Sequence, residues 1–114
     1  MKIRIVSKKY LDTTTENMKL EVEIFYSRGG WNLATGEDDP RGYWLSVQPV
    51  IKSDINGIKM ESRVLGSGLK KFLVETKIDR SGGKTEKAAM LLASEYEPIL
   101  LEKVCRKENL VLAA

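Results

Sequence analysis

Alternation of apolar and polar positions marks four segments of the chain as strands. In the clearest, residues 18–26, the apolar side chains Met18, Leu20, Val22, Ile24 and Tyr26 share one face, and Lys19, Glu21 and Glu23 share the other. Residues 2–10, 43–51 and 58–64 show the same period, and Asn56-Gly57 between the last two is a typical hairpin turn. One apolar and one polar face per strand predicts an antiparallel sheet covered on one side, with Phe25 and Trp44 as apolar exceptions on the solvated side.

The pattern changes after Gly66-Ser67-Gly68, where apolar residues begin to recur every three or four positions. This spacing predicts a helix over residues 69–80, from Leu69 through Phe72 and Leu73. A second helix is expected over 86–109, capped by Thr85 and kinked or split by Pro98 near Glu97. The predicted fold is therefore a single α+β domain, residues 1–114, in which a four-stranded antiparallel meander is followed by two helices on one face, in the order ββββαα.

A long connection, residues 27–42, separates the second and third expected strands. It contains four of the nine glycines, and Trp31 and Trp44 lie in it and just beyond it. Connections of this length in compact domains are usually functional or disordered, and the tryptophans favour function. In one interpretation Tyr43 belongs to the core and Trp31 folds back over the loop as a small core of its own. In the other, Trp31 or Trp44 forms a contact patch together with Arg28 or Arg41. Aromatic residues beside bases also suit nucleic-acid stacking.

Composition and charge exclude only a few classes of protein. The chain is 42% hydrophobic and 31% charged, as in ordinary globular proteins, and no apolar run approaches the length of a membrane helix. With no signal-peptide pattern, a cytoplasmic location is expected. The net charge of +3 is unevenly distributed, since residues 11–40 carry two bases and seven acids while residues 41–87 carry ten bases and five acids.

The candidate chemistry is sparse. The chain has no histidine and a single cysteine, Cys105, which excludes histidine-dependent nucleophile pairs and imidazole metal ligands. We therefore predict no catalytic residues, no metal site and no cofactor. An enzyme ranks third among the possible functions. Cys105 is expected in the core or at its boundary. The Gly66-Ser67-Gly68 and Ser81-Gly82-Gly83-Lys84 segments lack the spacing of a phosphate-binding loop and predict turns. Glu37-Asp38-Asp39 predicts a solvated acidic turn, or a negative contact for a basic partner.

Two stretches of the chain resemble a known pattern. The first stretch is Tyr26-Ser27-Arg28-Gly29-Gly30-Trp31-Asn32-Leu33-Ala34-Thr35-Gly36, and the second is Pro40-Arg41-Gly42-Tyr43-Trp44-Leu45-Ser46-Val47-Gln48-Pro49-Val50. They are similar to small uncharacterised proteins of plasmids, conjugative elements and phages of Firmicutes. That resemblance transfers no activity and no site residues. It implies a genomic setting in which small proteins often antagonise host defence, as anti-CRISPR proteins do.

The leading hypothesis is therefore a small non-enzymatic protein that inhibits a host macromolecule such as a CRISPR–Cas effector nuclease. A protein partner is expected to contact Arg28, Trp31, Asn32, Arg41 and Trp44, with Glu37, Asp38 and Asp39 as steering charges. The alternative is a nucleic-acid-binding accessory or regulatory protein that uses Lys70, Lys71, Lys77, Arg80 and Lys84. The pattern leaves the oligomeric state open.

Overall fold

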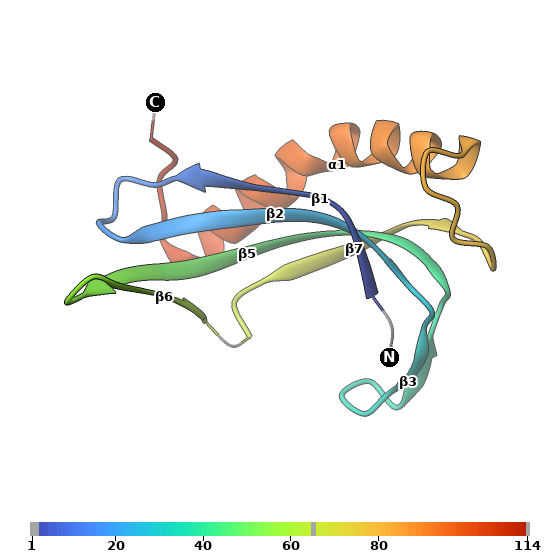
Figure 1. Ribbon diagram of the computed structural model, residues 1–114, viewed down its shortest axis with the longest axis horizontal. Coiled ribbons are helices and arrows are strands. Elements are labelled where there is room, and N and C mark those ends of the chain that lie inside the picture. Colours follow the sequence, from blue (N-terminus) through green and yellow to red (C-terminus); the bar gives the residue numbers. More distant parts are fainter. Residues whose placement is uncertain (1–2, 65, 114) are drawn as a thin grey trace.

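The computed structural model describes residues 3–64 and 66–113, which form a curved antiparallel sheet with one long helix across one face (Figure 1). The strands of the sheet are β1 (Ile3–Asp12), β2 (Met18–Ser27), β5 (Gly42–Ile55), β6 (Ile58–Arg63) and β7 (Leu69–Glu75). A separate two-stranded hairpin consists of β3 (Gly30–Asn32) and β4 (Glu37–Asp39), and the helix α1 spans Lys84–Glu108.

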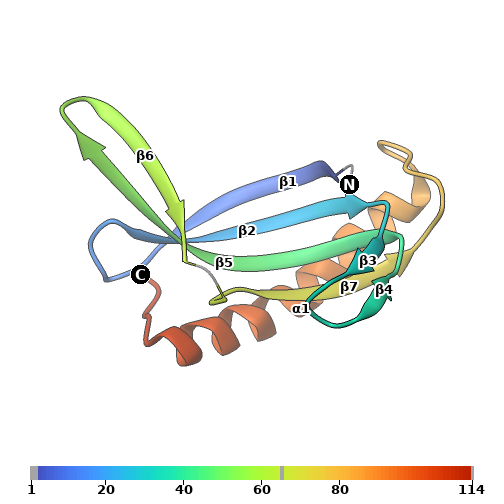
Figure 2. The same cartoon turned by 90° about the horizontal axis from the view of Figure 1, so that it is seen from below.

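The long strand β5 organises the sheet. It pairs with β2 along one edge, and its opposite edge is shared by β6, which covers residues 50–55, and β7, which covers residues 42–47. Because β6 occupies only part of that edge, the chain continues in the same direction and fills the remainder with β7 (Figure 2). All these pairings are antiparallel.

The predicted helix over residues 69–80 is wrong, because this segment forms β7 and then an irregular connection to α1. Leu69, Phe72 and Leu73 fit a helical spacing, and the apolar and polar residues of 69–75 do not alternate. The local pattern therefore favours the helix. The open edge of β5 decides the outcome, since hydrogen bonding there satisfies the backbone of residues 69–75.

The predicted ββββαα order is also wrong, because the described residues form seven strands and one helix. One extra strand is β7, in place of the first predicted helix. The extra pair, β3 and β4, arises inside the connection expected to lack strands. The helix begins two residues earlier than predicted, its N-cap is Gly83 instead of Thr85, and it runs through Pro98 without being split. Figure 1 shows its axis changing direction along its length, as expected for a helix that lacks one backbone donor at proline.

The core lies between the sheet and α1. The largest fully buried side chains here include Tyr43, Leu20, Leu45, Val47 and Val104, and the small residues Ala89 and Ala93 allow close approach of the helix. Tyr26 and Tyr43 pack edge to face with ring centroids 5.3 Å apart. Within the described residues, α1 does not combine the length and the hydrophobicity that a membrane-spanning helix requires.

The opposite face of the sheet, predicted to be solvated, is solvated only in part, because Lys59, Glu61 and Arg63 are exposed but other positions are buried. Glu21 is only 4% exposed, and Phe25 only 8%. The sheet curls over this face at one end: the Tyr10 hydroxyl of β1 donates to Glu61 of β6 at 3.2 Å, although two strands lie between them. In a flat sheet these strands would be about 14 Å apart. Arg63 adds two 3.0 Å hydrogen bonds to Glu21, which compensates the burial of that carboxylate.

Candidate binding surfaces

The connection between β2 and β5 forms a hairpin that projects from the sheet. Ser27 and Gly42 are the last paired residues of the two strands. Beyond them, β3 and β4 pair with each other instead of with the sheet, Trp31 opposite Asp38. Figures 1 and 2 show this β3–β4 hairpin standing away from the sheet, on the side opposite α1.

Asn32 holds the tip of the hairpin together. Its side-chain amide donates to both carboxylate oxygens of Asp39 at 3.3 Å, and its Oδ1 accepts a hydrogen bond from the Ala34 amide at 2.9 Å. The Gly36 amide closes the turn on the Asn32 carbonyl at 2.9 Å. Asn32 and Asp39 therefore act within the hairpin, and their polar groups are engaged before any partner arrives.

The base of the hairpin is held by arginine and glycine. The Arg41 Nε donates to the Arg28 carbonyl at 3.2 Å, which joins the two ends of the connection. Gly29 has a φ of +74°, and a Cβ there would meet the Asp39 carbonyl. The chains leaving and re-entering the sheet thus lie too close together for any residue larger than glycine at position 29.

The outer surface of the hairpin is apolar at two positions and acidic at two others. Trp31 is 60% exposed and Leu33 is 90% exposed. Glu37 and Asp38 are also exposed, and neither forms an ion pair within the part of the chain that the structure describes. An exposed indole beside unpaired carboxylates is an arrangement suited to contact with another macromolecule.

The structure brings together some of the predicted contact residues and separates others. Arg28, Trp31, Glu37 and Asp38 are exposed on the hairpin, whereas Trp44 belongs to β5. There its ring packs against Phe72 with centroids 5.0 Å apart, and its Nε1 is buried without an acceptor among the described residues. Leu33 was not predicted, although an apolar residue in a loop rich in glycine and acids was a usable signal.

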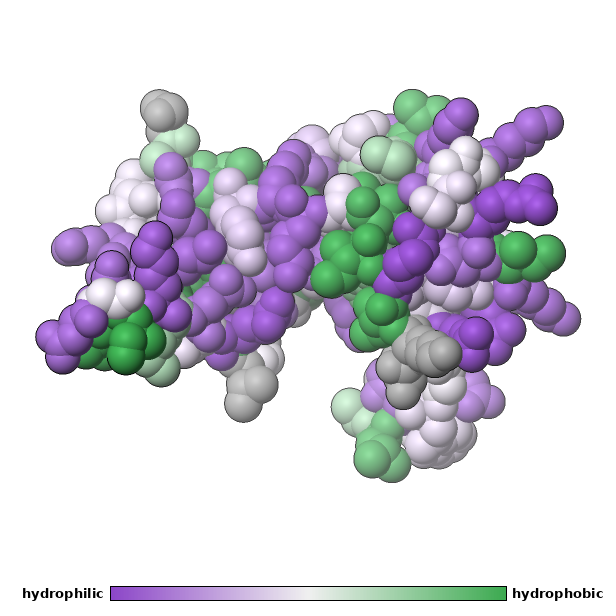
Figure 3. Space-filling model, viewed as in Figure 1, coloured by the Kyte–Doolittle hydropathy of each residue, from purple (hydrophilic) through white to green (hydrophobic). Residues whose placement is uncertain are grey.

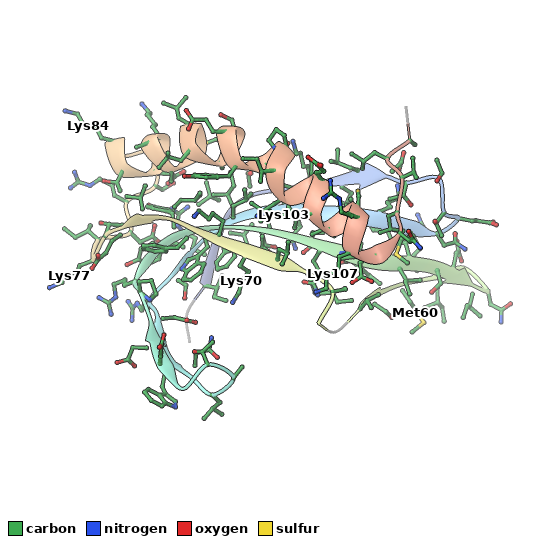
Figure 4. All side chains as sticks on the ribbon, turned by 180° about the vertical axis from the view of Figure 1, so that it is seen from behind. Met60, Lys70, Lys77, Lys84, Lys103 and Lys107 are labelled. Carbon is green, nitrogen blue, oxygen red and sulfur yellow. The ribbon has the colours of Figure 1, made fainter. Side chains whose placement is uncertain are left out.

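The predicted basic residues lie around the edge of the sheet formed by β7. Lys70 and Lys71 lie on opposite faces of this strand, and Lys77, Arg80 and Lys84 follow in the connection and at the start of α1. Figure 4 shows Lys70, Lys77, Lys84 and Lys103 on the side of the molecule where β7 is nearest the viewer. We call this the β7 side.

An open pocket of about 700 Å³ lies at one end of the β7 side, lined by residues that include Tyr43, Arg80, Lys84 and Lys87. The backbone amide of Gly82 at its rim already donates to Glu86 at 3.1 Å. The other glycine-rich segment, Gly66–Gly68, lies between β6 and β7, where the Ser67 hydroxyl donates to the Val64 carbonyl at 2.6 Å. That segment is a turn, away from any helix start.

The described residues hold no group of three or more His, Cys, Asp or Glu side chains placed to bind a metal ion. Cys105 is half-buried against the core, and burial raises the pKa of its thiol, which disfavours the thiolate. Burial, followed by the Glu61 carboxylate, raises the pKa of Tyr10 to about 12. These groups stabilise the fold in the positions they occupy.

Comparison with known protein families, curated proteins and solved structures finds no significant match to this chain. The resemblance of the 26–50 region to mobile-element proteins therefore stays a prediction. The evidence about function comes from the two surfaces themselves. Figure 3 shows hydrophilic side chains over much of one face, interrupted by separate hydrophobic patches.

Proposed function

We propose that this chain is a non-enzymatic binding protein that engages a protein partner through the β3–β4 hairpin. The observation that carries the proposal is the 60% exposure of Trp31 beside the 90% exposed Leu33 on a hairpin held together internally by Asn32 and Asp39. Tryptophan is enriched among residues that dominate binding energy, and an ordered hairpin loses less conformational entropy on binding than a flexible loop.

The acidic outer part of the hairpin favours a basic partner surface, whereas Arg28 and Arg41 lie at its base. Glu37 and Asp38 are unpaired and exposed, so they speed encounter with positively charged surfaces more than they add affinity. Nucleic-acid-binding grooves of nucleases are surfaces of this kind. Together with the resemblance to mobile-element proteins, this supports a specific version in which the partner is a CRISPR–Cas effector nuclease and binding inhibits it.

The test compares two double variants that remove equal numbers of exposed apolar side chains. Trp31→Ala/Leu33→Ala removes the hairpin contacts, and the control Ile78→Ala/Leu91→Ala removes two side chains that are each 70% exposed elsewhere. Inhibition of target-DNA cleavage is measured with a panel of purified Cas effector nucleases. We expect the hairpin variant to lose about 2 kcal/mol of binding free energy or more, the range of a binding hot spot, and the control to match wild type.

Two outcomes would contradict the proposal. If wild-type protein inhibits a nuclease and both variants retain full inhibition, the hairpin is not the contact surface. If both variants lose inhibition equally while circular dichroism shows them folded, the loss does not depend on Trp31 and Leu33. Absence of inhibition across the panel would reject the nuclease version.

A further inference from the structure

The described cations differ in whether a carboxylate pairs with them. Arg4, Lys8, Lys9, Lys19, Lys52, Arg63 and Arg106 form ion pairs with carboxylates. Those on the β7 side form none within the described ranges, although all are exposed: Lys70, Lys71, Lys77, Arg80, Lys84 and Lys103. Five cations outside this set also lack an ion pair, so the β7 side holds six of the eleven described cations without one; the other five are Arg28, Arg41, Lys59, Lys87 and Lys107.

Two of these cations are held in place by aromatic rings. The Lys70 Nζ lies 5.4 Å from the centre of the Trp44 ring, and the Lys71 Nζ lies 4.9 Å from the centre of the Tyr96 ring on α1. A cation over an aromatic face is attracted without being neutralised. The edge strand thus presents one fixed positive charge on each face of the sheet.

Acidic residues offset the positive charge of the β7 side only in part. Asp79 is bound by Arg4, and Glu102 by Arg106. Glu75 lies at the far end of β7, after both of its lysines. Glu75 and the exposed Glu95 of α1 have no ion pair among the described residues. Two further unpaired acids, Glu37 and Asp38, are on the β3–β4 hairpin, which leaves the sheet on the side opposite α1 (Figure 1).

From this distribution we propose that the β7 side binds the phosphate backbone of duplex DNA, without regard to sequence. Clustered, unpaired lysines release condensed counterions when they meet phosphates, which is the main source of sequence-independent affinity. This surface is distinct from the hairpin proposed to bind protein. It represents a second binding activity of the chain.

The aromatic residues of the β7 side favour a duplex over a single strand. Binding of single strands relies on exposed rings on which bases stack. Here Trp44 packs against Phe72 and lies under Lys70, and Tyr96 lies under Lys71, so both rings are engaged within the molecule. Lysine heads act as point charges, which suits phosphate contact more than base recognition.

Protection of an exposed edge strand is a second use of lysines, because charge there discourages pairing with other sheets. It accounts for Lys70 and Lys71, which lie on β7. It does not account for Lys77, Lys84 and Lys103, which lie in the following connection and on α1. Phosphate binding explains why these three lysines lie on the same side of the molecule as β7.

The experiment measures binding of the full chain to a fluorescent 25-base-pair duplex as a function of salt. Lys84→Gln/Lys103→Gln removes two cations from the β7 side. Its control, Arg28→Gln/Lys59→Gln, removes two exposed cations elsewhere that also lack ion pairs, so both variants have the same net charge. Thermal melting confirms that both are folded.

We expect wild type to bind with an affinity that falls steeply with salt. The β7-side variant should bind about tenfold more weakly at roughly 50 mM salt, with a log–log slope shallower by about two, since each lysine–phosphate contact contributes about one. The control should retain the wild-type slope. Equal losses in the two variants, tighter binding to a single strand of the same sequence, or no binding to the duplex would each overturn the proposal. None of these results bears on inhibition through Trp31 and Leu33.

Discussion

Arg4 is the residue that ties the start of β1 to the start of α1. Its guanidinium donates two hydrogen bonds to Asp79, at 2.6 and 2.7 Å, and a third to Glu86 at 2.8 Å. Tyr43 donates to the same Asp79 carboxylate at 3.3 Å. The Arg4 hydrogen bonds hold the pKa of Asp79 below its ordinary range, and burial raises the pKa of Tyr43. One cation thereby fixes the connection that carries Lys77 and Arg80.

The lowered pKa of Asp79 predicts a stability that depends on acid. The Asp79 carboxylate takes up a proton more readily in the unfolded state than in the folded state. The stability that its ionised form contributes is therefore fully present above the ordinary Asp pKa of about 3.9, and it is lost as the pH falls through the lower pKa of the folded state. Arg4→Gln should reduce the free energy of unfolding at pH 7 by about 2 kcal/mol and flatten its decline between about pH 5 and 2. Urea unfolding across this range measures both effects.

The matched control is Arg106→Gln, which removes an exposed ion pair within α1, with side chains 80% and 69% exposed. It should change stability by less than about 0.5 kcal/mol. If the two variants show the same acid dependence, Arg4 does not control the ionisation of Asp79.

At the scale of elements, the junction between β5 and β7 depends on Gly42. This residue has a φ of +156°, and a Cβ on it would meet the Val74 carbonyl and approach the Phe72 ring to 3.0 Å. The close approach lies where the β3–β4 hairpin rejoins the sheet. Glycine at this position therefore allows three strands to meet at one corner.

Gly42→Ala should cost about 3 kcal/mol of folding free energy, because a methyl group would push β7 from β5 and strain the backbone. Gly36→Ala is the control, since its φ is +71° but nothing lies within 4 Å of the added carbon. It should cost only about 1 kcal/mol, the backbone term alone. Equal changes in melting temperature would show that the corner tolerates a side chain.

The elements that could be predicted from the sequence are those whose period is long and unambiguous. Residues 18–26 alternate over nine positions, and α1 repeats its apolar face over several turns, so both were located to within two residues. The segment 69–75 could not be assigned correctly, because its residues fit a helical spacing and do not alternate, while the deciding factor, the free edge of β5, is tertiary. The burial of Glu21 could not be predicted either, because it depends on the curl of the whole sheet and not on the alternation of residues along one strand.

The candidate surfaces were predictable in composition but not in arrangement. The sequence places Trp31, Glu37 and Asp38 in one connection, and that is where they stay. It does not reveal that Asn32 and Asp39 are engaged with each other, because the hydrogen bond needs the turn to form first. Trp44 was grouped with Trp31 by sequence proximity, yet the last β2–β5 pair, Ser27 with Gly42, separates the hairpin from the strand.

At the scale of the whole molecule, the chain consists of a packed body and a hairpin that shares little of its core. The buried core residues of the body come from β2, β5 and α1, with Leu110 just after the helix, whereas none of residues 30–39 is buried. Glu37 and Asp38 of the hairpin also lie away from the unpaired cations of the β7 side, which belongs to the body. The surface proposed to bind protein therefore lies outside the part of the molecule that holds the core.

Removal of the hairpin should leave the body folded. Because Ser27 and Gly42 face each other directly, residues 28–41 can be replaced by Asn-Gly, the two-residue turn that best joins antiparallel strands. We expect the melting temperature to change by less than about 5 °C, which corresponds to about 1 kcal/mol in a domain of this size. Differential scanning calorimetry measures this change. A loss of cooperative unfolding would show that the hairpin is part of the folding unit.

The contrasting surroundings of the two tryptophans provide spectroscopic reporters within the native sequence. Trp31 is in water, whereas the Trp44 ring is shielded by Phe72 and Lys70. Their fluorescence should therefore differ in wavelength and in access to a dissolved quencher. A partner that covers the hairpin should protect the long-wavelength component, while unfolding should shift the short-wavelength one. Single Trp→Phe variants assign each signal, so complex formation and denaturation can be followed separately without an added label.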